Sequence, residues 1–317
     1  MGSLEHLAAG QMNVVKAGPK TTVQDLGRSG YQHLGISPGG VADRHAACWS
    51  NHLVGNSSGA AVLEISLGQS EFRFAADCLI AVCGADCDVR INGRRAGNWQ
   101  NHWLRRGDTL SFGASRSGNH GYLAIGGGFQ CSPVFGSCAS DARAKLGPNQ
   151  GAPLSSGAIL NFPITQRSRI PGRAVPYRYR RNYRELLTLR LLPSQQYRQL
   201  SHHDIQTLLN ATYKVGVESD KMGTRLIGAP IVMSDSTQSG YSEGIGAGAV
   251  QVPPDGQPII LGREHQTIGG YARLGTIYQV DLDRLAQLPP GAEVRFSIGS
   301  LNDAQLRLRQ HQDFFNY

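Results

Sequence analysis

The chain has 317 residues, 40% of them hydrophobic and 17% charged, which is enough for two domains of ordinary size. Because such a chain can bury a large apolar core, the composition excludes a wholly disordered protein and a miniprotein that depends on disulfides. The net charge of +8 favours anionic partners but is too modest to imply nucleic acid. The 40 glycines follow no Gly-X-Y period and predict tight turns between short strands.

The N-terminal residues 1–11 have neither the basic start nor the apolar stretch of a secretory signal, and the chain contains no run of 18 apolar residues. We interpret residues 1–11 as an extraneous tag or disordered terminus, and we expect a cytoplasmic protein with no membrane segment. The cysteines show no C-x-x-C spacing, so we expect buried, reduced thiols. They are Cys48, Cys78, Cys83, Cys87, Cys131 and Cys138.

Short strand-like runs recur through the first half of the chain. They are Asn13–Lys16, Val62–Leu67, Glu71–Phe74, Leu79–Val82, Asp88–Ile91, Thr109–Phe112 and Tyr122–Ile125. Asn92-Gly93 predicts a two-residue hairpin, because both residues tolerate positive φ. An apolar stripe that starts at Ala42 and ends before Gly55 predicts one helix.

A nine-residue pattern, L-x-x-G-x-x-[LV]-x-F, occurs at Leu104–Phe112, Leu154–Phe162 and Leu288–Phe296. Each copy reads as a turn that feeds a strand, and the spread over both halves indicates two related β modules. We expect modules at 12–163 and 186–317, joined by a basic linker at 164–185.

The predicted linker interleaves arginines with tyrosines, a combination that can hold single-stranded nucleic acid. A single basic run is a weak footprint for that function, so we interpret it as a surface segment held by its tyrosines and expect no nucleic acid partner. The arginines include Arg167, Arg169, Arg173, Arg178, Arg180, Arg181 and Arg184, and the tyrosines are Tyr177, Tyr179 and Tyr183.

The second half predicts further strands and a few helices. The strands are Leu187–Leu192, Tyr213–Val217, Ala249–Val252, Pro258–Leu261 and Thr276–Val280; the helices are one opened by Ser201, with Asp204 three residues on, then Asp281–Leu288 and Ser300–Phe315. The whole chain is therefore predicted to be mainly β, with barrels or sandwiches.

Standard catalytic motifs are poorly supported. Gly55–Gly59 fits G-x-S-x-G, but it follows a helix, so we interpret it as a loop that stops the helix. Gly244–Gly248 leads into a strand and lacks the helix N-terminus that binds phosphate. No histidine shares ligand spacing with a cysteine or carboxylate, so we expect no metal site. What stands out are polar residues within glycine-rich loops, at 21–28, 35–43, 220–226, 251–261 and 266–271.

These loops resemble the biotin-dependent carboxyltransferase-like family, which contains the C subunit of bacterial 5-oxoprolinase, also called allophanate hydrolase subunit 2. Blocks that carry the resemblance include Thr21–Arg28, Asn51–Asn56, Tyr122–Gly127 and Val134–Cys138, within a match over residues 12–315. The resemblance implies a mainly β fold of two related cyclophilin-like β-barrel modules with a few short helices.

The resemblance also implies a function. Such a chain is part of a hydrolase that opens 5-oxo-L-proline to L-glutamate with ATP and magnesium, at a site shared with partner chains that resemble the B and A subunits of 5-oxoprolinase. Two alternatives remain: a urea- or allophanate-type carboxyltransferase subunit, whose biotin comes from another protein, and a regulatory antagonist of a kinase inhibitor.

For this chemistry we expect Asp43 to be the catalytic carboxylate, with Lys221 and Arg225 supplying charge. The competing interpretations are a helix-end carboxylate and surface charges beside a turn. The further residues expected to bind substrate or nucleotide are Gly39, Gly40, Gln257, Gln266, Thr267, Gly269, Gly270 and Tyr271.

The chain departs from the family pattern at two of these loops. The usual D-R-M-G reads Asp220-Lys221-Met222-Gly223, so the charge is kept but the bidentate fork of arginine is lost. The usual M-x-D reads Gly262-Arg263-Glu264. Such departures bear on the identity of the substrate more than on the fold.

Overall fold

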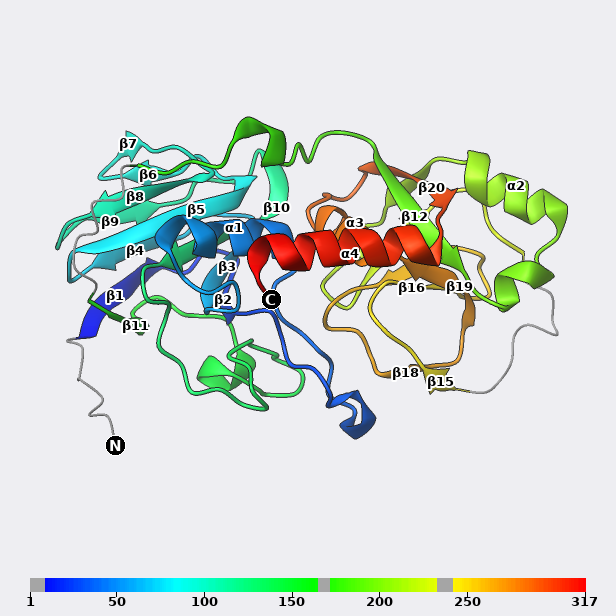
Figure 1. Cartoon of the computed structure of the whole chain (residues 1–317), viewed down its shortest axis with the longest axis horizontal. Coiled ribbons are helices and arrows are strands. Elements are labelled where there is room, and N and C mark those ends of the chain that lie inside the picture. The colour runs from blue at the N-terminus through cyan, green and yellow to red at the C-terminus, as the bar shows by residue number, and fades with distance from the viewer. Residues whose placement is uncertain (1–8, 165–171, 233–241) are drawn as a thin grey trace. The chain divides into compact units, whose positions relative to one another are not determined.

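The computed structural model describes residues 9–164, 172–232 and 242–317, and the chain divides into two compact units (Figure 1). Unit 1 contains the described parts of Met1–Gly27, Arg44–Arg181 and Phe315–Tyr317; unit 2 contains those of Arg28–Asp43 and Asn182–Phe314. The division differs from the expected boundaries, because the segment Arg28–Asp43 belongs with the second half of the chain.

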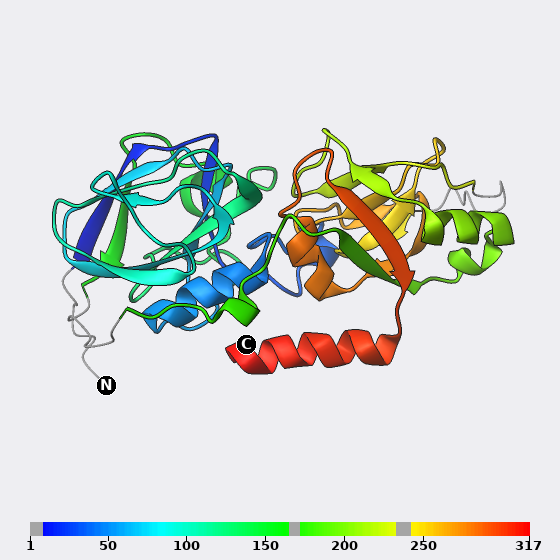
Figure 2. The same cartoon turned by 90° about the horizontal axis from the view of Figure 1, so that it is seen from above.

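Unit 1 consists of two antiparallel sheets and one α-helix. The six-stranded sheet has the order β11-β1-β4-β9-β6-β7 and the five-stranded sheet the order β2-β3-β10-β5-β8. The helix α1 packs against β5, β8 and β10 (Figure 2). The elements are β1 (Ala9–Lys16), β2 (Lys20–Gln24), α1 (Arg44–Val54), β3 (Val62–Ser66), β4 (Glu71–Phe74), β5 (Cys78–Asp86), β6 (Arg90–Ile91), β7 (Arg94–Arg95), β8 (Gln100–Leu104), β9 (Thr109–Ser111), β10 (Ser117–Ile125), β11 (Ile159–Pro163) and the 3₁₀ helices η2 (Pro148–Gly151) and η3 (Tyr177–Tyr179).

The core of unit 1 collects the apolar side chains that alternate along these strands, among them Met12, Phe72, Leu63, Ile80 and Leu123. The strand β1 shows the alternation, with Gly10, Met12 and Val14 buried between exposed residues.

The N-terminal boundary of the fold lies earlier than the sequence indicated. β1 begins at Ala9 and pairs with β11, with Ala9 opposite Pro163 and Gln11 opposite Asn161. Residues 9–11 are therefore part of the six-stranded sheet, because their backbone continues its ladder. The rest of the expected tag, residues 1–8, lies outside the described residues.

Part of the expected linker is also integral to unit 1. Val175 is fully buried, and its N–H donates to the Trp99 carbonyl at 2.8 Å. The Asn101 N–H donates to the Arg173 carbonyl at 2.9 Å. This segment adds backbone pairing beside β8 and is not a free connection, whereas Arg167 and Arg169 lie outside the described residues.

Two local predictions in unit 1 are confirmed in detail. Asn92 and Gly93 have φ of 50° and 76°, and they join β6 to β7 as a two-residue hairpin. The helix α1 is followed by Gly55 at φ 78°, the left-handed conformation that stops a helix. Its start differs from the predicted stripe, since Ala42 precedes the first helical residue, Arg44.

The cysteine prediction is wrong for one pair. Cys131 and Cys138 form a disulfide, with their Cα atoms 6.1 Å apart, because the turn around Val134 and Ser137 folds the loop back on itself. The remaining cysteines are buried free thiols, as expected, and burial raises the pKa of Cys87 to about 11. The Cys87 thiol therefore stays protonated at neutral pH.

Unit 2 is built around a closed barrel with the strand order β12-β19-β16-β17-β14-β13-β20. β12 and β20 pair in parallel, and the other neighbours are antiparallel. The elements are η1 (Gln32–Leu34), β12 (Leu187–Pro193), η4 (Gln196–Gln199), α2 (His202–Asn210), β13 (Tyr213–Val215), β14 (Gly223–Ile227), β15 (Glu243–Gly244), β16 (Ala249–Val252), β17 (Ile259–Leu261), β18 (Ile268–Gly269), β19 (Ala272–Ile277), α3 (Gln279–Leu285), β20 (Glu293–Ile298) and α4 (Leu301–Phe315). The mainly β prediction, with a barrel and a few helices, is confirmed.

The helix starts in unit 2 follow the sequence signals with one shift. Ser201 caps α2 by accepting from the Asp204 N–H at 3.0 Å. The predicted strand Thr276–Val280 is too long, since β19 ends at Ile277 and α3 begins at Gln279. A short continuous apolar run cannot separate strand from helix by its period, which explains the error.

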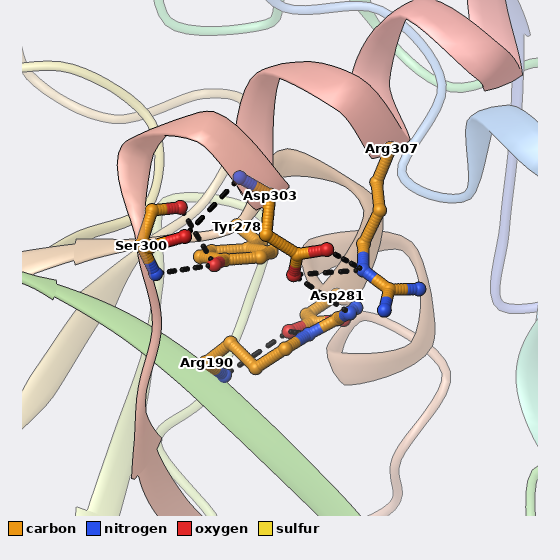
Figure 3. Close-up of polar contacts among 6 residues, drawn as sticks. All are labelled: Arg190, Tyr278, Asp281, Ser300, Asp303 and Arg307. Atoms are coloured by element: carbon orange, nitrogen blue, oxygen red, sulfur yellow. Dashed lines mark hydrogen bonds and ion pairs between the residues drawn. The ribbon is translucent and has the colours of Figure 1, made fainter.

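A polar network fixes the beginning of α4 to α3 and β12 (Figure 3). Arg190 pairs with Asp281 through two hydrogen bonds, and its guanidinium lies 4.7 Å from the centre of the Tyr278 ring. The Tyr278 hydroxyl donates to the Ser300 carbonyl at 2.8 Å and accepts from the Ser300 N–H at 2.7 Å. Asp303 then donates its backbone N–H to Ser300 Oγ at 3.2 Å, so the first turn of α4 is capped.

The repeated L-x-x-G pattern has one structural explanation in both units. Gly107, Gly157 and Gly291 have φ of 92°, 89° and 83°, and each begins the turn into β9, β11 or β20. Each glycine donates its N–H to a carbonyl of another strand, at 2.7 to 2.8 Å. The pattern is therefore a left-handed turn that only glycine adopts at low cost, followed by a strand that buries its Phe.

Candidate functional site

The site assembled in unit 2 begins with the segment Arg28–Asp43. Arg28 N–H donates to the Pro38 carbonyl at 2.8 Å, which closes a loop around η1. Gly39 and Gly40 have φ of 60° and 85°, and the Gly39 N–H donates to the Arg263 carbonyl at 3.0 Å. The glycine turn is therefore seated against the segment that follows β17, and the N–H of Gly39 is already engaged.

Lys221 is held by the same glycine turn. Its Nζ donates to the Gly40 carbonyl at 2.9 Å and lies 3.0 Å from Glu264 Oε1. The Lys221 side chain is 6% exposed and the Glu264 side chain 14%, so the charges form a nearly buried pair. Such a pair is stable only when both charges keep their partners.

The Asp220 carboxylate explains why Lys221 points inward. Asp220 Oδ1 accepts the N–H groups of Met222 at 2.8 Å and Gly223 at 3.2 Å, which folds a tight turn immediately before β14. Side chains of this type form local turns because the short carboxylate reaches the backbone two residues on. The turn leaves Asp220 exposed and directs Lys221 into the protein.

The segment after β17 approaches this turn closely. The Gly262 N–H donates to the Met222 carbonyl at 2.8 Å, and the Glu264 N–H donates to the Lys221 carbonyl at 2.9 Å. A Cβ on Gly262 would meet the Lys221 carbonyl oxygen at 2.3 Å. Glycine is thus required there for Glu264 to reach the Lys221 ammonium.

Asp43 is completely buried within unit 2. Its Oδ2 accepts hydrogen bonds from the Tyr183 hydroxyl at 2.8 Å and from Gln287 Nε2 at 3.0 Å. Both of these donors are neutral, and they orient the carboxylate. The structure therefore places Asp43 as a positioned carboxylate three residues after Gly40; its catalytic role stays a prediction.

Two further buried polar residues flank Glu264. Arg263 donates to Gln279 Oε1 at 2.8 Å and lies 3.3 Å from Asp283. His265 is 1% exposed, and its Nδ1 donates to the Gln266 carbonyl at 2.5 Å. Burial lowers the pKa of His265, and the nearby Arg263 guanidinium lowers it further. The ring is therefore neutral near pH 7, with Nε2 as a buried acceptor that pairs with no described residue.

A pocket of about 590 Å³ lies in unit 2 between the segment Arg28–Asp43 and the two-stranded ribbon β15–β18. It is lined by Gln32, His33, Gly35, Gly244, Ile245, Gly246, Thr267 and Ile268. Its volume is in the range of small-molecule sites, and one of its lining residues, Thr267, is among those expected to bind ligand.

The other residues of the 266–271 loop differ in their surroundings: Gly269 packs against other side chains, and three residues are exposed. A Cβ on Gly269 would meet Gln251 Nε2 and Ile245 Cδ1 at 2.7 Å, so a larger residue there would displace the ends of these two side chains. Gln266, Gly270 and Tyr271 are exposed. Their roles as ligand contacts stay predictions.

Arg225 and Gln257 are engaged elsewhere in the barrel. Arg225 pairs with Asp255, and its backbone N–H donates to Ser219 Oγ at 3.1 Å. The Gln257 amide accepts from the Gly228 N–H at 2.8 Å and donates to the Gly228 carbonyl at 3.2 Å. The structure joins neither residue to Lys221, and it gives Gln257 a local bracing role.

Several residues of the site were missed by the sequence reasoning. Glu264 was visible only as the acidic member of a changed family block, and Tyr183 as part of the basic linker. Gln287 and His265 carry no local signal, and Gln251 was visible only as the first residue of the polar loop 251–261.

The Thr21–Arg28 block has a structural role in unit 1. The Asp25 carboxylate accepts from Ser137 Oγ and from the Cys138 N–H, both at 2.6 Å. It therefore anchors the loop that carries the disulfide.

Within residues 9–164, 172–232 and 242–317, no three His, Cys, Asp or Glu side chains are grouped so as to hold a metal ion. The helices in those ranges are too short or too polar to cross a membrane.

Comparison with known proteins agrees with this picture. The model of the carboxyltransferase domain, subdomain A and B, matches residues 34–298. The chain is 34% identical to the C subunit of 5-oxoprolinase from Escherichia coli, over 95% of each chain. Among solved structures, TTHA0988 has a TM-score of 0.82 at 32% identity, covering 92% of this chain and 56% of that one. The Kluyveromyces lactis urea carboxylase has a TM-score of 0.88 at 25% identity, covering 98% of this chain and 29% of that one. The chain therefore belongs to the carboxyltransferase domain family with subdomains A and B.

Proposed function

We propose that this chain is one component of an ATP-dependent 5-oxoprolinase that opens 5-oxo-L-proline to L-glutamate. The observation that carries the proposal is the likeness to the 5-oxoprolinase C subunit along 95% of both chains. A match of that extent relates the whole chain to one component of that enzyme, whereas the urea carboxylase match covers only 29% of a longer protein.

The chemistry explains why ATP is needed. A lactam carbonyl is a poor electrophile, because the ring nitrogen donates electron density to it. Transfer of the γ-phosphoryl group from ATP to the lactam oxygen makes the carbon a better electrophile, and water then adds to that carbon. The ring C–N bond breaks as the nitrogen leaves as the amine, and hydrolysis of the resulting acyl phosphate releases phosphate and glutamate. Such a site needs cations or N–H groups near the phosphate and a carboxylate that orients or deprotonates a reacting group.

Residues of unit 2 supply the required groups. Lys221 is the buried cation, held by the Gly40 carbonyl, and Asp43 is the buried carboxylate, held by Tyr183 and Gln287. The pocket lined by Thr267 accommodates a small substrate. Glu264 is the carboxylate that pairs with Lys221 and helps to hold it beside the glycine turn.

The proposal makes the site composite, with groups from partner chains that resemble the B and A subunits of 5-oxoprolinase. Lys221 is paired with Glu264 and the Gly39 N–H is occupied, so neither group is free to bind phosphate at this site of unit 2. We predict that the purified chain neither hydrolyses ATP nor binds it tightly at this site, because each missing charge-assisted bond weakens binding by about 1.5–3 kcal/mol. ATPase activity of the single chain at the rate of the complex would contradict this.

The decisive experiment co-expresses the chain with the proteins encoded beside it and purifies the complex. Release of glutamate and ADP is then measured with and without 5-oxoproline. The proposal predicts substrate-dependent release of both products in equal amounts. An intact complex that releases neither glutamate nor ADP would contradict the proposed function.

A carboxyltransferase acting on a urea-like substrate is the second candidate, favoured by the TM-score of 0.88 with urea carboxylase. The same complex distinguishes the two, since a carboxyltransferase requires a biotin-bearing carrier and transfers carboxylate. Carboxylation of urea that depends on an added biotin carrier would favour this candidate over lactam opening.

A further inference from the structure

A second pocket lies in unit 1, where the outer edges of its two sheets meet. β7 is the last strand of the six-stranded sheet and β8 the last strand of the five-stranded sheet (Figure 1). The pocket has a volume of about 660 Å³. It is lined by Ile91, Asn92, Arg94, Arg95, Ala96, Gly97, Gln100 and His102. None of these residues belongs to the candidate site of unit 2.

The charge around this pocket is unbalanced. The exposed Arg94 side chain makes no hydrogen bond or ion pair with any described residue. Arg95 has Asp88 as its nearest carboxylate, at 3.8 Å, and Asp88 also lies 3.0 Å from Arg90 and 3.7 Å from Arg116. The hydrogen bond from Arg90 is the main reason that the pKa of Asp88 is lowered. Because Asp88 is shared among three arginines, it neutralises Arg95 only in part, and Arg94 has no carboxylate of a described residue beside it. Both arginines can therefore bind an anion.

The wall formed by β8 adds a titratable group. His102 Nε2 donates to the Gly97 carbonyl at 2.8 Å, so in the neutral ring Nδ1 is the acceptor. Burial lowers the pKa of His102, and the bond to Gly97 partly opposes that shift. The charged residues that line the pocket with His102 are Arg94 and Arg95 of the hairpin.

We propose that the pocket between β7 and β8 binds a small multivalent oxyanion. Both arginines line the pocket, and each guanidinium offers the fork of N–H groups that phosphate and carboxylate groups prefer. The volume is that of a small-molecule site, and no Phe, Tyr or Trp lines it for stacking nucleic acid bases. The hairpin turn Asn92-Gly93 positions the arginines, because its two positive φ values fix the register of Arg90 against Arg95.

The test is a titration of the full chain with pyrophosphate and, separately, with citrate, at constant ionic strength. The two anions distinguish a phosphate source from a polycarboxylate source. The proposal predicts saturable binding of at least one of them. It also predicts binding at least tenfold weaker after R94Q/R95Q, since charge-assisted hydrogen bonds are lost. Absence of saturable binding for both anions would overturn it.

The matched control is R105Q/R106Q, which removes an adjacent, exposed pair of arginines in unit 1 that does not line the pocket. Binding should change less than about twofold in the control. If both double substitutions weaken anion binding equally, the anion is attracted to the basic protein as a whole. That result would overturn the proposed pocket.

A second readout places the anion. Nuclear magnetic resonance of His102 should show a pKa raised by about one unit at saturation, because a nearby negative charge favours the imidazolium. An unchanged pKa of His102 with saturating ligand would overturn the assignment to this pocket.

Discussion

Lys221 in unit 2 and Arg94 in unit 1 are both cations beside tight turns, yet they lie in opposite surroundings. The Lys221 side chain is 6% exposed and is held by Glu264 and the Gly40 carbonyl. Arg94 is exposed and its side chain contacts no acceptor among the described residues. The contrast indicates that the charge of Lys221 is part of the folded structure, whereas that of Arg94 is available for binding. Substitution should therefore affect stability at the first position and affinity at the second.

The largest effect is expected for Lys221→Met, which leaves Glu264 buried without its partner and removes the donor to Gly40. Breaking a buried pair from one side costs about 3–5 kcal/mol. The free energy of unfolding should fall by about 3 kcal/mol in urea titration, at the lower end because Glu264 keeps some exposure.

Two variants sharpen this result. Lys221→Met combined with Glu264→Gln should recover part of the loss, because no uncompensated charge remains. Arg94→Gln should change the free energy of unfolding by less than about 0.5 kcal/mol. If Arg94→Gln lowered the free energy of unfolding as much as Lys221→Met, the two cations would not differ in their structural role.

The buried histidines should make both units less stable in acid. Burial lowers the pKa of His102 in unit 1 and of His265 in unit 2. The folded state then binds fewer protons than the unfolded state, in which histidine has a pKa near 6.5. Stability is therefore full above about pH 6.5 and falls as the pH drops below it, by up to about 1.4 kcal/mol per pH unit for each histidine.

The measurement is the urea midpoint between pH 7.5 and 5.5, with His265→Gln and His102→Gln as matched variants. Each substitution should flatten the dependence of the midpoint on pH. A slope that neither variant changes would show that other groups control acid stability.

A smaller effect, common to both units, is expected at the three turn glycines. Gly107→Ala, Gly157→Ala and Gly291→Ala have no steric neighbour within 4 Å, so the cost should be the left-handed backbone alone, about 1 kcal/mol each. Gly244→Ala, which also has open space but no positive φ, is the control. Thermal unfolding that separates the three turn variants from the control supports one shared turn; unequal costs would argue against it.

Local signals predicted the fold well. The hairpin at Asn92-Gly93, the cap at Ser201 and the three glycine turns depend on the backbone preferences of a few adjacent residues. Such preferences can be predicted from the residue types alone. The disulfide Cys131–Cys138 was missed because a spacing of seven matches no standard motif and its closure depends on the intervening turn.

The candidate site was predicted only in part. Lys221 donates to the Gly40 carbonyl, whereas Arg225 is paired with Asp255. The partners that define the site are tertiary: Asp43 and Gln287 are 244 residues apart in sequence, and no pattern in a single chain relates them. The segment Arg28–Asp43 folds with residues that follow Asn182, which local propensities do not encode.

We propose that Asp43 serves ATP-dependent lactam opening, and the direct test is the release of ADP from ATP that depends on 5-oxoproline in the assembled complex. Asp43→Asn keeps the size of the side chain; Asp281→Asn, which weakens the buried pair with Arg190 outside the site, is the control. We expect Asp43→Asn to reduce turnover by about 10²-fold or more, and Asp281→Asn by less than about threefold, at a temperature where both are folded. Unchanged turnover in Asp43→Asn together with a lower melting temperature would show that Asp43 is only structural.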